Sequence, residues 1–278
     1  MNDWPSGIGL VVRQIKYQIL MFWRVPIALF FTLLLPLIML VLFNALFGDG
    51  EVTVDGKTWP TRQFYTGGLA AFTAVSATYT NLANMVPIRR EEGVLKRWRG
   101  TPLPTWIYLT GMIVAAVVIA IFGALFMLGL GAVAYDLEVD AGKMPAAAVT
   151  FIVGVAAFAA LGMAVAGLVP TASSASAVAN ATILPLAFIS NIFIPIEDPP
   201  AWLATIGDFF PLKPFASSFQ DAFNPLVGAP AFDWGALARV AAWGIAGLVV
   251  ALMTFRWEPP TGGPTRRRGV RSATVDVQ

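Results

Sequence analysis

The apolar residues of this chain gather into six long runs separated by shorter polar segments. The runs cover residues 25–47, 64–86, 106–134, 146–169, 176–196 and 235–255. A helix needs about 20 predominantly apolar residues to cross a hydrocarbon core of roughly 30 Å. These runs are apolar on every side, whereas the strands of a membrane barrel are short and alternate. The pattern therefore predicts an all-α integral membrane protein with six transmembrane helices.

Residues 1–24, ahead of the first run, have the periodicity of an amphipathic helix. One face carries apolar residues, which are Ile8, Val12, Ile15, Ile19 and Phe22. The opposite face carries polar and basic residues, which are Arg13, Gln14, Tyr17, Gln18 and Arg24. This pattern predicts a helix in the membrane interface; the alternative is an amphipathic helix packed on a partner. A secretory signal is not expected, since the apolar run that follows is too long and no small-residue cleavage site follows it.

The composition agrees with a membrane protein. Of the 278 residues, 57% are hydrophobic and only 12% are charged, with a mean hydropathy of +0.72. Soluble domains are about 25% charged, so this chain cannot cover the surface of a soluble globule. It has no cysteine and no histidine, which removes thiolate chemistry, disulfides and the commonest general base and metal ligand. We therefore expect a chain that is not an enzyme, with no catalytic residue and no metal site.

Lys and Arg residues collect on one side of the predicted bundle. Most of the 18 lie in segments 13–24, 89–99 and 256–271, whereas acidic residues gather in the loops on the other side. The excess of basic residues marks the cytoplasmic side, so both termini are expected there, in a multi-pass protein of the cytoplasmic membrane. Residues 259–278 are too polar to build a core and predict a disordered basic tail that touches anionic lipid. Residues 1–258 are then a single transmembrane domain.

The chain lacks the charged relay residues and the nucleotide-binding motif that would let it power transport on its own. No run carries Asp, Glu, Lys or Arg in its interior, and Arg239 lies in the first turn of the last one. Ion-coupled transporters usually carry intramembrane ionisable groups as proton or sodium relays. The chain also lacks the G-x-x-x-x-G-K-[ST] phosphate cradle of nucleotide hydrolases. Energy for uphill transport would therefore come from another polypeptide.

Residues 87–104 are the most informative cytoplasmic segment. Residues 91–99 have helix-forming character, Gly100 suits the position after a helix, and Pro102 prevents continuation. Leu95 and Trp98 share a face suited to docking on protein. A short rigid helix between two spans would act as a handle that moves both of them. The alternative is a basic loop that only sets the topology.

Two motifs resemble the ABC type-2 exporter permeases. Residues 90–95 (Arg-Glu-Glu-Gly-Val-Leu), followed by Thr-Pro-Leu at 101–103, resemble the family's R-E-x-G-x-L…T-P-L pattern. Residues 190–215 are similar to its F-x-P…P-x-W-L…N-P-L-x-x stretch before the last helix, although a phenylalanine precedes Pro211 where the family often has Asn. With six spans and cytoplasmic termini, the resemblance covers nearly the whole chain.

The resemblance implies a half-transporter. Two such permeases, identical or paired with a sister chain, would work with two cytoplasmic nucleotide-binding ATPase subunits. ATP and Mg would bind in those partners, with no cofactor in this chain and no nucleic acid among its partners. The family's coupling helix would contain Arg90, Glu91, Glu92, Gly93, Leu95, Lys96, Arg97 and Trp98. Our hypothesis is that Glu91 makes a charge-assisted contact, either at the base of the spans or to the ATPase.

Two spans carry polar residues at helical spacing. In the second span these are Thr73, Ser76, Thr80 and Asn84, and in the fifth they are Ser176, Asn180 and Asn191. One interpretation is contact between helices, since small hydroxyl and amide residues often hydrogen-bond across membrane helices. The other is the lining of a substrate path, because the family's second and fifth helices face the dimer axis. A neutral lining of this kind would suit amphipathic or lipid-like cargo.

Two short apolar stretches, 201–210 and 215–223, precede the last run. Each is too short to span and is predicted to be a re-entrant or interfacial helix on the outer face. The alternative is an anchor in the outer leaflet, rich in Trp and Phe.

The leading hypothesis for function is the permease subunit of an ATP-driven exporter of hydrophobic, drug-like compounds, resembling permeases of the daunorubicin-resistance type. Alternatives are an exporter of lipid or lipid-linked polysaccharide and a channel or scaffold without ATP coupling. A membrane enzyme acting on lipid is disfavoured, because the residue types that such chemistry needs are missing.

Overall fold

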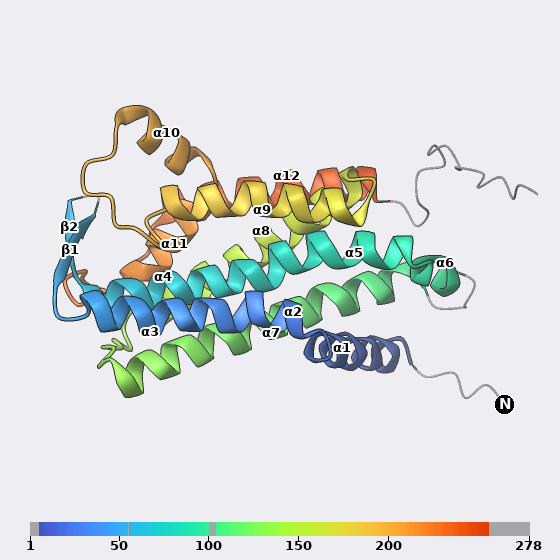
Figure 1. Cartoon of the computed structure of the whole chain (residues 1–278), viewed down its shortest axis with the longest axis horizontal. Helices are drawn as coiled ribbons and strands as arrows, with labels where there is room; N and C mark the ends of the chain where they lie inside the picture. Colours follow the sequence, from blue (N-terminus) through green and yellow to red (C-terminus); the bar gives the residue numbers. More distant parts are fainter. Residues whose placement is uncertain (1–5, 55, 100–103, 256–278) are drawn as a thin grey trace, which may run out of the picture.

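Long helices run side by side along the molecule, and short elements close one end of it (Figure 1). The structure is a computed structural model that describes residues 6–54, 56–99 and 104–255. The elements in chain order are α1 (Gly7–Trp23), α2 (Pro26–Leu29), the π-helical segment η1 (Phe30–Leu34), α3 (Leu35–Phe47), β1 (Glu51–Val54), β2 (Lys57–Pro60), α4 (Thr61–Val75), the π-helical segment η2 (Ser76–Thr80), α5 (Asn81–Glu91), α6 (Val94–Arg99), α7 (Thr105–Ala134), α8 (Met144–Leu168), α9 (Ala172–Ile189), α10 (Ala201–Phe209), α11 (Leu212–Asp221) and α12 (Trp234–Thr254). The predicted tail, 259–278, lies outside the described residues.

Five helices are long and apolar enough to cross a membrane, which agrees with five of the six predicted runs. They are Pro26–Phe47, Trp106–Ala134, Met144–Leu168, Ala172–Ile189 and Trp234–Thr254. The predicted end of the fifth run at residue 196 is wrong. The chain leaves the helix after Ile189 and turns at Asn191, whose φ is +57°. Asparagine tolerates this left-handed conformation better than most residues, so it can end a helix within an apolar run.

The remaining predicted run, 64–86, lies in one helical rod made of α4, η2 and α5. This rod is not among the five helices apolar enough to span a membrane. It lies in the middle of the bundle, where α3, α7 and α11 pack on α4, and residues 63–79 are buried. A helix enclosed by protein does not face lipid, and its small polar residues are hydrogen-bonded within the bundle, as Thr73 is to the Leu69 carbonyl and Thr78 to the Ala74 carbonyl. The count of six spans stays a prediction.

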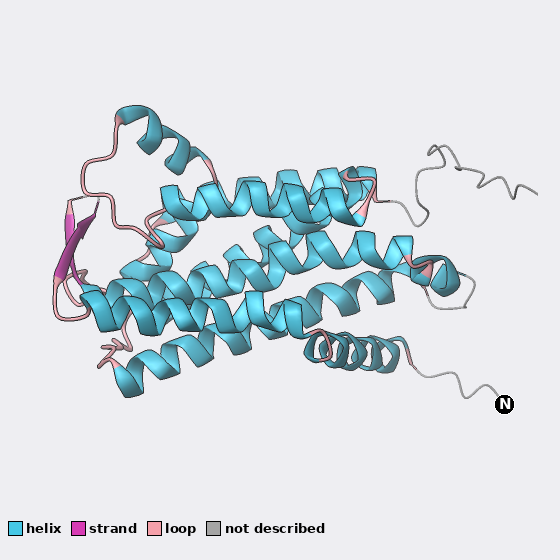
Figure 2. Ribbon diagram, in the orientation of Figure 1, coloured by secondary structure: helices cyan, strands magenta, loops and turns pink. Residues whose placement is uncertain are grey.

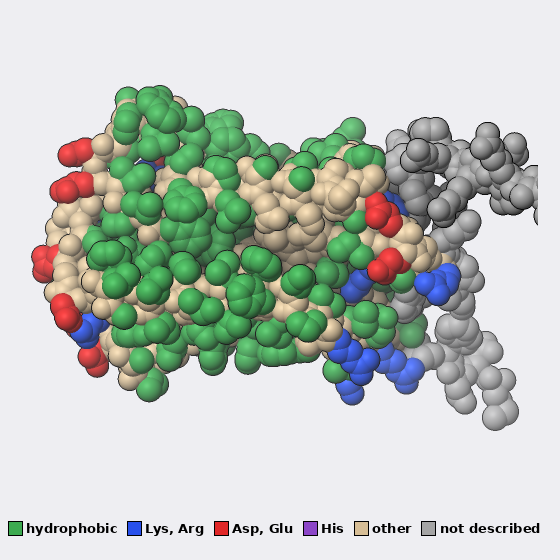
Figure 3. Space-filling view, viewed as in Figure 1, with side chains coloured by type: hydrophobic (Ala, Val, Ile, Leu, Met, Phe, Trp, Pro, Cys, Tyr) green, Lys and Arg blue, Asp and Glu red, His purple; other side chains and the backbone are tan. Residues whose placement is uncertain are grey.

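The surface divides into an apolar middle and two charged ends. Figure 3 shows hydrophobic side chains over the middle of the visible face, Asp and Glu side chains at the hairpin end, and Lys and Arg side chains near α1 and α6. A broad exposed apolar belt is typical of a surface that meets lipid rather than water. Exposed residues of the belt include Phe31, Leu125, Ile152, Leu248 and Leu252.

Helix α1 confirms the predicted amphipathic helix, but the bundle covers part of the face that was predicted to be polar. Gln14 and Gln18, predicted on the polar face, are buried, together with Phe22. Helix α1 packs on α7, where Gly111 leaves room for the Gln14 side chain. Ile8 and Val12 stay exposed, at 79% and 58%. This exposed apolar side fits the predicted interfacial placement, which remains a prediction.

Three short elements close the opposite end (Figure 2). The antiparallel hairpin β1–β2, in which Val52 pairs with Trp59, was not predicted. Helix α11 replaces the predicted stretch 215–223; all but one of its residues are buried, and it contacts α4, α8 and α12. Helix α10 is mostly exposed, with Gly207 as its buried residue. One of the two predicted short helices therefore closes the bundle, and a re-entrant role for either stays a prediction.

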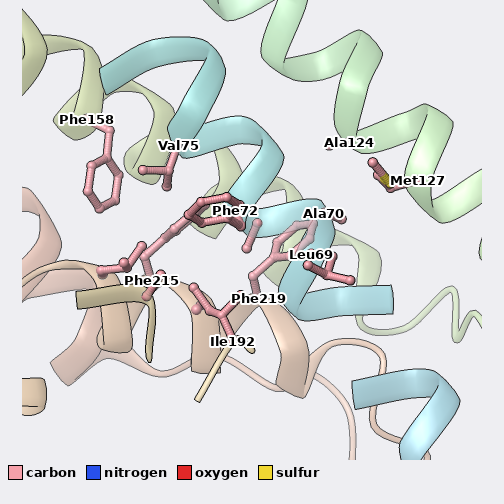
Figure 4. Packing of buried hydrophobic residues seen from close by; sticks show 14 of the residues in the cluster. Leu69, Ala70, Phe72, Val75, Ala124, Met127, Phe158, Ile192, Phe215 and Phe219 are labelled. Carbon is pink, nitrogen blue, oxygen red and sulfur yellow. The ribbon is translucent and has the colours of Figure 1, made fainter. Parts of the chain in front are cut away.

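The core lies where α4, α8 and α11 meet. Phe72 and Val75 on α4 face Phe158 on α8 and Phe215 on α11 (Figure 4). The helices approach closely because α8 is rich in small residues. A Cβ atom added at Gly154 would lie 2.1 Å from the Phe215 ring. Van der Waals packing of small residues against large ones is the main source of helix association in a lipid environment.

Candidate functional site

The strongest candidate site is the junction between α8 and α9, which residues at the carboxyl end of α5 bind through hydrogen bonds. Arg90 is buried and binds the carboxyl end of α8. Its Nη1 donates to the Ala166 carbonyl at 3.4 Å, and its Nη2 donates to the Val169 and Pro170 carbonyls at 2.5 and 3.1 Å. Unpaired carbonyls give a helix end partial negative charge, so a cation stabilises it.

Glu91 binds the start of the next helix. Its Oε1 accepts a hydrogen bond from the Ala172 backbone N–H at 2.7 Å. Ala172 is the first residue of α9, whose amino end carries partial positive charge. Neighbouring residues of opposite charge thus bind helix ends of opposite polarity. The contact at the base of the spans, one of the two proposed for Glu91, is present.

Arg90 remains positively charged although it is buried. Removal from water lowers the pKa of the Arg90 guanidinium, and the neighbouring Glu91 carboxylate raises it. The ordinary pKa of a guanidinium lies so far above neutral pH that the group stays protonated in proteins. The grip on α8 therefore does not depend on pH in the physiological range.

Arg89, at the start of the segment 89–99 that the family resemblance assigns to coupling, makes contacts with α1 and α7 that were not predicted. Its Nη1 donates to the Gln18 Oε1 on α1 and to the Tyr108 hydroxyl on α7, the latter at 3.3 Å. Residues 89–91 therefore connect α5 to α1, α7, α8 and α9. The available signal was a third charged residue beside the Arg-Glu pair at the end of a span.

The predicted continuous helix over 91–99 is wrong, because the chain turns at Gly93. Helix α5 ends at Glu91, and α6 begins at Val94. Gly93 has a φ of +69°, a left-handed conformation that glycine adopts without a steric penalty. Gly93 therefore separates two helices, and α6 is a distinct short helix at this end of the molecule.

The remaining coupling candidates divide between the bundle and the surface. Leu95 is fully buried and packs with Leu82, Val86 and Tyr108, so α6 docks on its own bundle. Glu92 and Arg97 are exposed, and Arg97 donates to the Glu92 carbonyl at 3.5 Å. The side chains of Lys96 and Trp98 lie outside those that the structure describes.

The polar residues of the second predicted span do not face one common path. Thr73 donates to the Leu69 carbonyl at 2.8 Å and lies against Gly123 of α7. Asn84 donates to the Thr80 carbonyl and accepts from the Ser176 hydroxyl of α9, at 2.7 and 2.6 Å. Ser76 and Thr80 lie in η2, and Ser76 is buried. A π-helical segment shifts the angular register, so spacing derived from an α-helix does not hold across it.

In the fifth predicted span, the expected common face holds for Ser176 and Asn180, which lie four residues apart on α9, and is wrong for Asn191. Asn180 is exposed on α9, whereas Ser176 is bound to Asn84. Asn191 is buried beyond the end of α9, where its Oδ1 accepts from the Ile196 backbone N–H at 3.2 Å. Because the helix ends earlier than predicted, Asn191 stabilises a turn. A second contact between the spans, Tyr79 with Thr182 at 2.6 Å, supports the helix-contact interpretation.

A hollow of about 970 Å³ between α3, α4 and α9 is the structure's other candidate site. It is lined mainly by apolar side chains, including Met39, Phe43, Tyr65, Phe72, Leu184 and Phe188. None of the seven polar residues of the predicted path lines it. Apolar residues that line a hollow look the same in sequence as those that face lipid, so no pattern could have identified them.

Among the described residues, no group of three or more Asp or Glu residues is placed to hold a metal ion.

Comparisons with known proteins agree with the fold and with the motifs. A family model described as ABC-2 type transporter matches residues 10–224. The chain is 30% identical over 261 residues to the daunorubicin resistance ABC transporter permease protein DrrB1 of Streptomyces coeruleorubidus, covering 90% of this chain and 86% of the relative.

Two further relatives match over shorter segments. The probable multidrug ABC transporter permease YbhR of Escherichia coli K12 is 27% identical over 126 residues, which are 45% of this chain and 34% of the relative. The putative transport permease YvfS of Bacillus subtilis is 24% identical over 163 residues, which are 59% and 65% of the two chains. Residues 10–224, which the family model matches, include Arg90, Glu91 and the long apolar helices up to α9. This multi-pass membrane protein therefore belongs to the ABC-2 type transporter family.

Proposed function

We propose that this chain is the permease subunit of an ATP-driven exporter that moves a hydrophobic or amphipathic compound out across the cytoplasmic membrane. Family membership supports a permease role, and the name of the 30% identical relative supports drug-like cargo. Two copies, or this chain and a sister, would assemble with two nucleotide-binding ATPase subunits. Those partners would bind ATP and Mg, and the basic end with α1 and α6 would face the cytoplasm.

The observation that carries the proposal is the grip of Arg90 and Glu91 on the α8–α9 junction. An ATPase that moves α6 would also move α5, because Leu95 is buried against Leu82 and Val86. Through Arg90 and Glu91 the same displacement would reach two more helices. Motion at one end of a membrane bundle is transmitted by packed helices and hydrogen bonds with two discrete arrangements. Glu92 and Arg97, which are exposed beside α6, would contact the ATPase.

The variant Glu91→Ala is expected to reduce export about tenfold while the partner ATPase continues to hydrolyse ATP, a loss within the range of typical coupling energies. The contact to the Ala172 N–H would be lost, so movement of α5 would no longer reach α9. Export and ATP turnover would be measured in the same vesicles. Glu91→Gln, which keeps an acceptor oxygen without the charge, should retain part of the coupling.

The matched control is Glu138→Ala, which removes an exposed carboxylate at the opposite end and should export normally. Full export by the Glu91→Ala variant at equal membrane abundance would contradict the coupling role. Transport by the purified chain without any ATPase would instead favour the channel alternative.

The apolar hollow between α3, α4 and α9 supports hydrophobic cargo, since apolar pockets with few polar groups bind apolar ligands. A lipid or lipid-linked polysaccharide is the alternative cargo. Of the predicted path residues, Asn180 is exposed on α9 and suits a direct test.

The variant Asn180→Leu is expected to change the ratio of export rates between a neutral and a cationic dye by a few fold, with normal protein abundance. The exposed amide would be lost without disturbing a contact of the bundle. Asn191→Leu should differ, because leucine at a φ of +57° and the lost hydrogen bond to Ile196 lower stability. An unchanged dye ratio in Asn180→Leu would remove this residue from the path.

A further inference from the structure

A groove of about 290 Å³ lies between α8, α9 and α12. Leu161 and Val165 of α8 and Ile183 and Leu186 of α9 form two of its walls. The third wall is one stripe of α12, made of Trp243, Ala246, Gly247 and Val250. These residues recur at three- and four-residue steps, so they share one face of the helix.

The groove presents an apolar surface. Its polar side chains, Tyr79 and Thr182, are hydrogen-bonded to each other at 2.6 Å, and the Thr182 hydroxyl also lies 2.8 Å from the Val178 carbonyl oxygen. An apolar occupant would therefore bury no unpaired polar group there. Hydrocarbon is the occupant that such a surface favours inside a membrane.

Trp243 connects this groove to a second hollow, of about 490 Å³, that contains Arg239. Arg239 precedes Trp243 by one turn on the same stripe of α12. Its guanidinium donates to the Gly235 and Asp208 carbonyls, at 3.3 and 3.5 Å. The Asp208 carboxylate instead lies 3.2 Å from Lys213. Among the described residues, no carboxylate forms an ion pair with Arg239, so an anion would find a free cation beside the groove.

The length of the stripe matches one leaflet of a bilayer. Eleven residues separate Arg239 from Val250, which is about 16 Å along an α-helix. Half of a hydrocarbon core is about 15 Å thick. Trp243, with Phe209 and Phe210 packed on its ring at 5.4 and 5.5 Å, lies where aromatic residues usually meet the headgroups. Along α12, Arg239 would therefore lie at the level of a lipid phosphate, the cluster around Trp243 at the level of the glycerol, and the apolar groove at the level of an acyl chain.

We propose that this surface binds one phospholipid, with its phosphate at Arg239 and one acyl chain in the groove between α8, α9 and α12. Arg239 and Trp243 also hydrogen-bond the Asp208 and Phe209 carbonyls of α10, the latter at 2.8 Å. A bound lipid therefore stabilises the contact of α10 with the bundle. The proposal rests on membrane embedding alone and is independent of ATP coupling and of the cargo.

The test is native mass spectrometry of the full-length chain in detergent, titrated with phosphatidylglycerol. We expect one tightly retained lipid per chain. Arg239→Gln should weaken retention about tenfold, the loss expected for one charged hydrogen-bond partner. Ala246→Phe, which fills the groove, should weaken it as much while leaving Arg239 in place. The matched controls are Arg13→Gln at the other end of the molecule and Val249→Phe on an exposed part of α12, and both should retain the lipid.

Three results would overturn the proposal. Equal retention by all four variants would place the lipid elsewhere. Equal retention of diacylglycerol with the same chains would remove the phosphate contact. Binding of the neutral dye Nile red in place of the lipid, unaffected by Arg239→Gln and abolished by Ala246→Phe, would assign the groove to apolar cargo. Loss of ATP-coupled export with normal lipid retention would contradict the proposed function and leave this inference intact.

Discussion

Replacing Arg90 with methionine is expected to lower the free energy of unfolding by about 3 kcal/mol. Methionine matches much of the buried length of arginine but donates no hydrogen bond, so the Ala166, Val169 and Pro170 carbonyls would lose their shared donor. The contact to the Ala166 carbonyl is buried and the other two are partly buried, so water replaces the lost donor poorly and the loss is costly. The measurement is an SDS-induced unfolding curve in mixed micelles.

The control for this experiment is Arg97→Met on α6. It removes the same charge from an exposed side chain, which donates a weak hydrogen bond to the Glu92 carbonyl at 3.5 Å. Its unfolding free energy should lie within about 0.5 kcal/mol of the original protein. If the two variants unfold alike, the α8–α9 junction does not depend on Arg90, and the coupling route through it fails as well.

The second large effect is expected at Gly162 on α8. A Cβ atom there would lie 2.6 Å from the Tyr79 carbonyl oxygen and 3.0 Å from its Cα. Backbone atoms cannot move aside as a flexible side chain can, so Gly162→Ala should push α8 away from η2. We expect a loss of about 2 kcal/mol in the same unfolding assay.

Gly129→Ala on α7 is the matched control, because a Cβ atom at Gly129 meets nothing within 4 Å. Alanine is the better helix former, so this variant should be neutral or slightly more stable. A stable Gly162→Ala variant would show that the rod formed by α4, η2 and α5 can shift within the bundle at little cost.

The local elements were largely predictable, and two of the misses had a readable signal. The span ends at 47, 134 and 255 lie within one residue of the observed helices, because polar loops interrupt the apolar runs there. The hairpin was missed although Asp55-Gly56 between alternating residues is a strong hairpin signal. Gly93 was a similar signal within the predicted helix 91–99, since glycine readily adopts positive φ and can end a helix.

The residues of the candidate site were predicted, but of their contacts only the one between Glu91 and the base of the spans was anticipated. Arg90 and Glu91 were identified from a motif, and no sequence pattern indicated that they bind opposite ends of two helices. Thr73 and Asn84 were grouped by spacing, and η2 turns them toward different neighbours. Spacing rules assume one regular helix, whereas a π-helical segment changes the register by an amount that composition does not encode.

Composition and periodicity by themselves determined that this chain is helical, enters a membrane and carries its basic residues at one end, because the transfer of apolar and charged groups into lipid depends mainly on residue type. Only the tertiary structure decided which partner each polar group has: carbonyls at the end of α8 for Arg90 and a backbone amide of α9 for Glu91. It also decided that Gln14 and Gln18 are buried rather than exposed. Such choices depend on which residues distant in sequence come within about 3 Å of one another, and that distance is a property of packed helices.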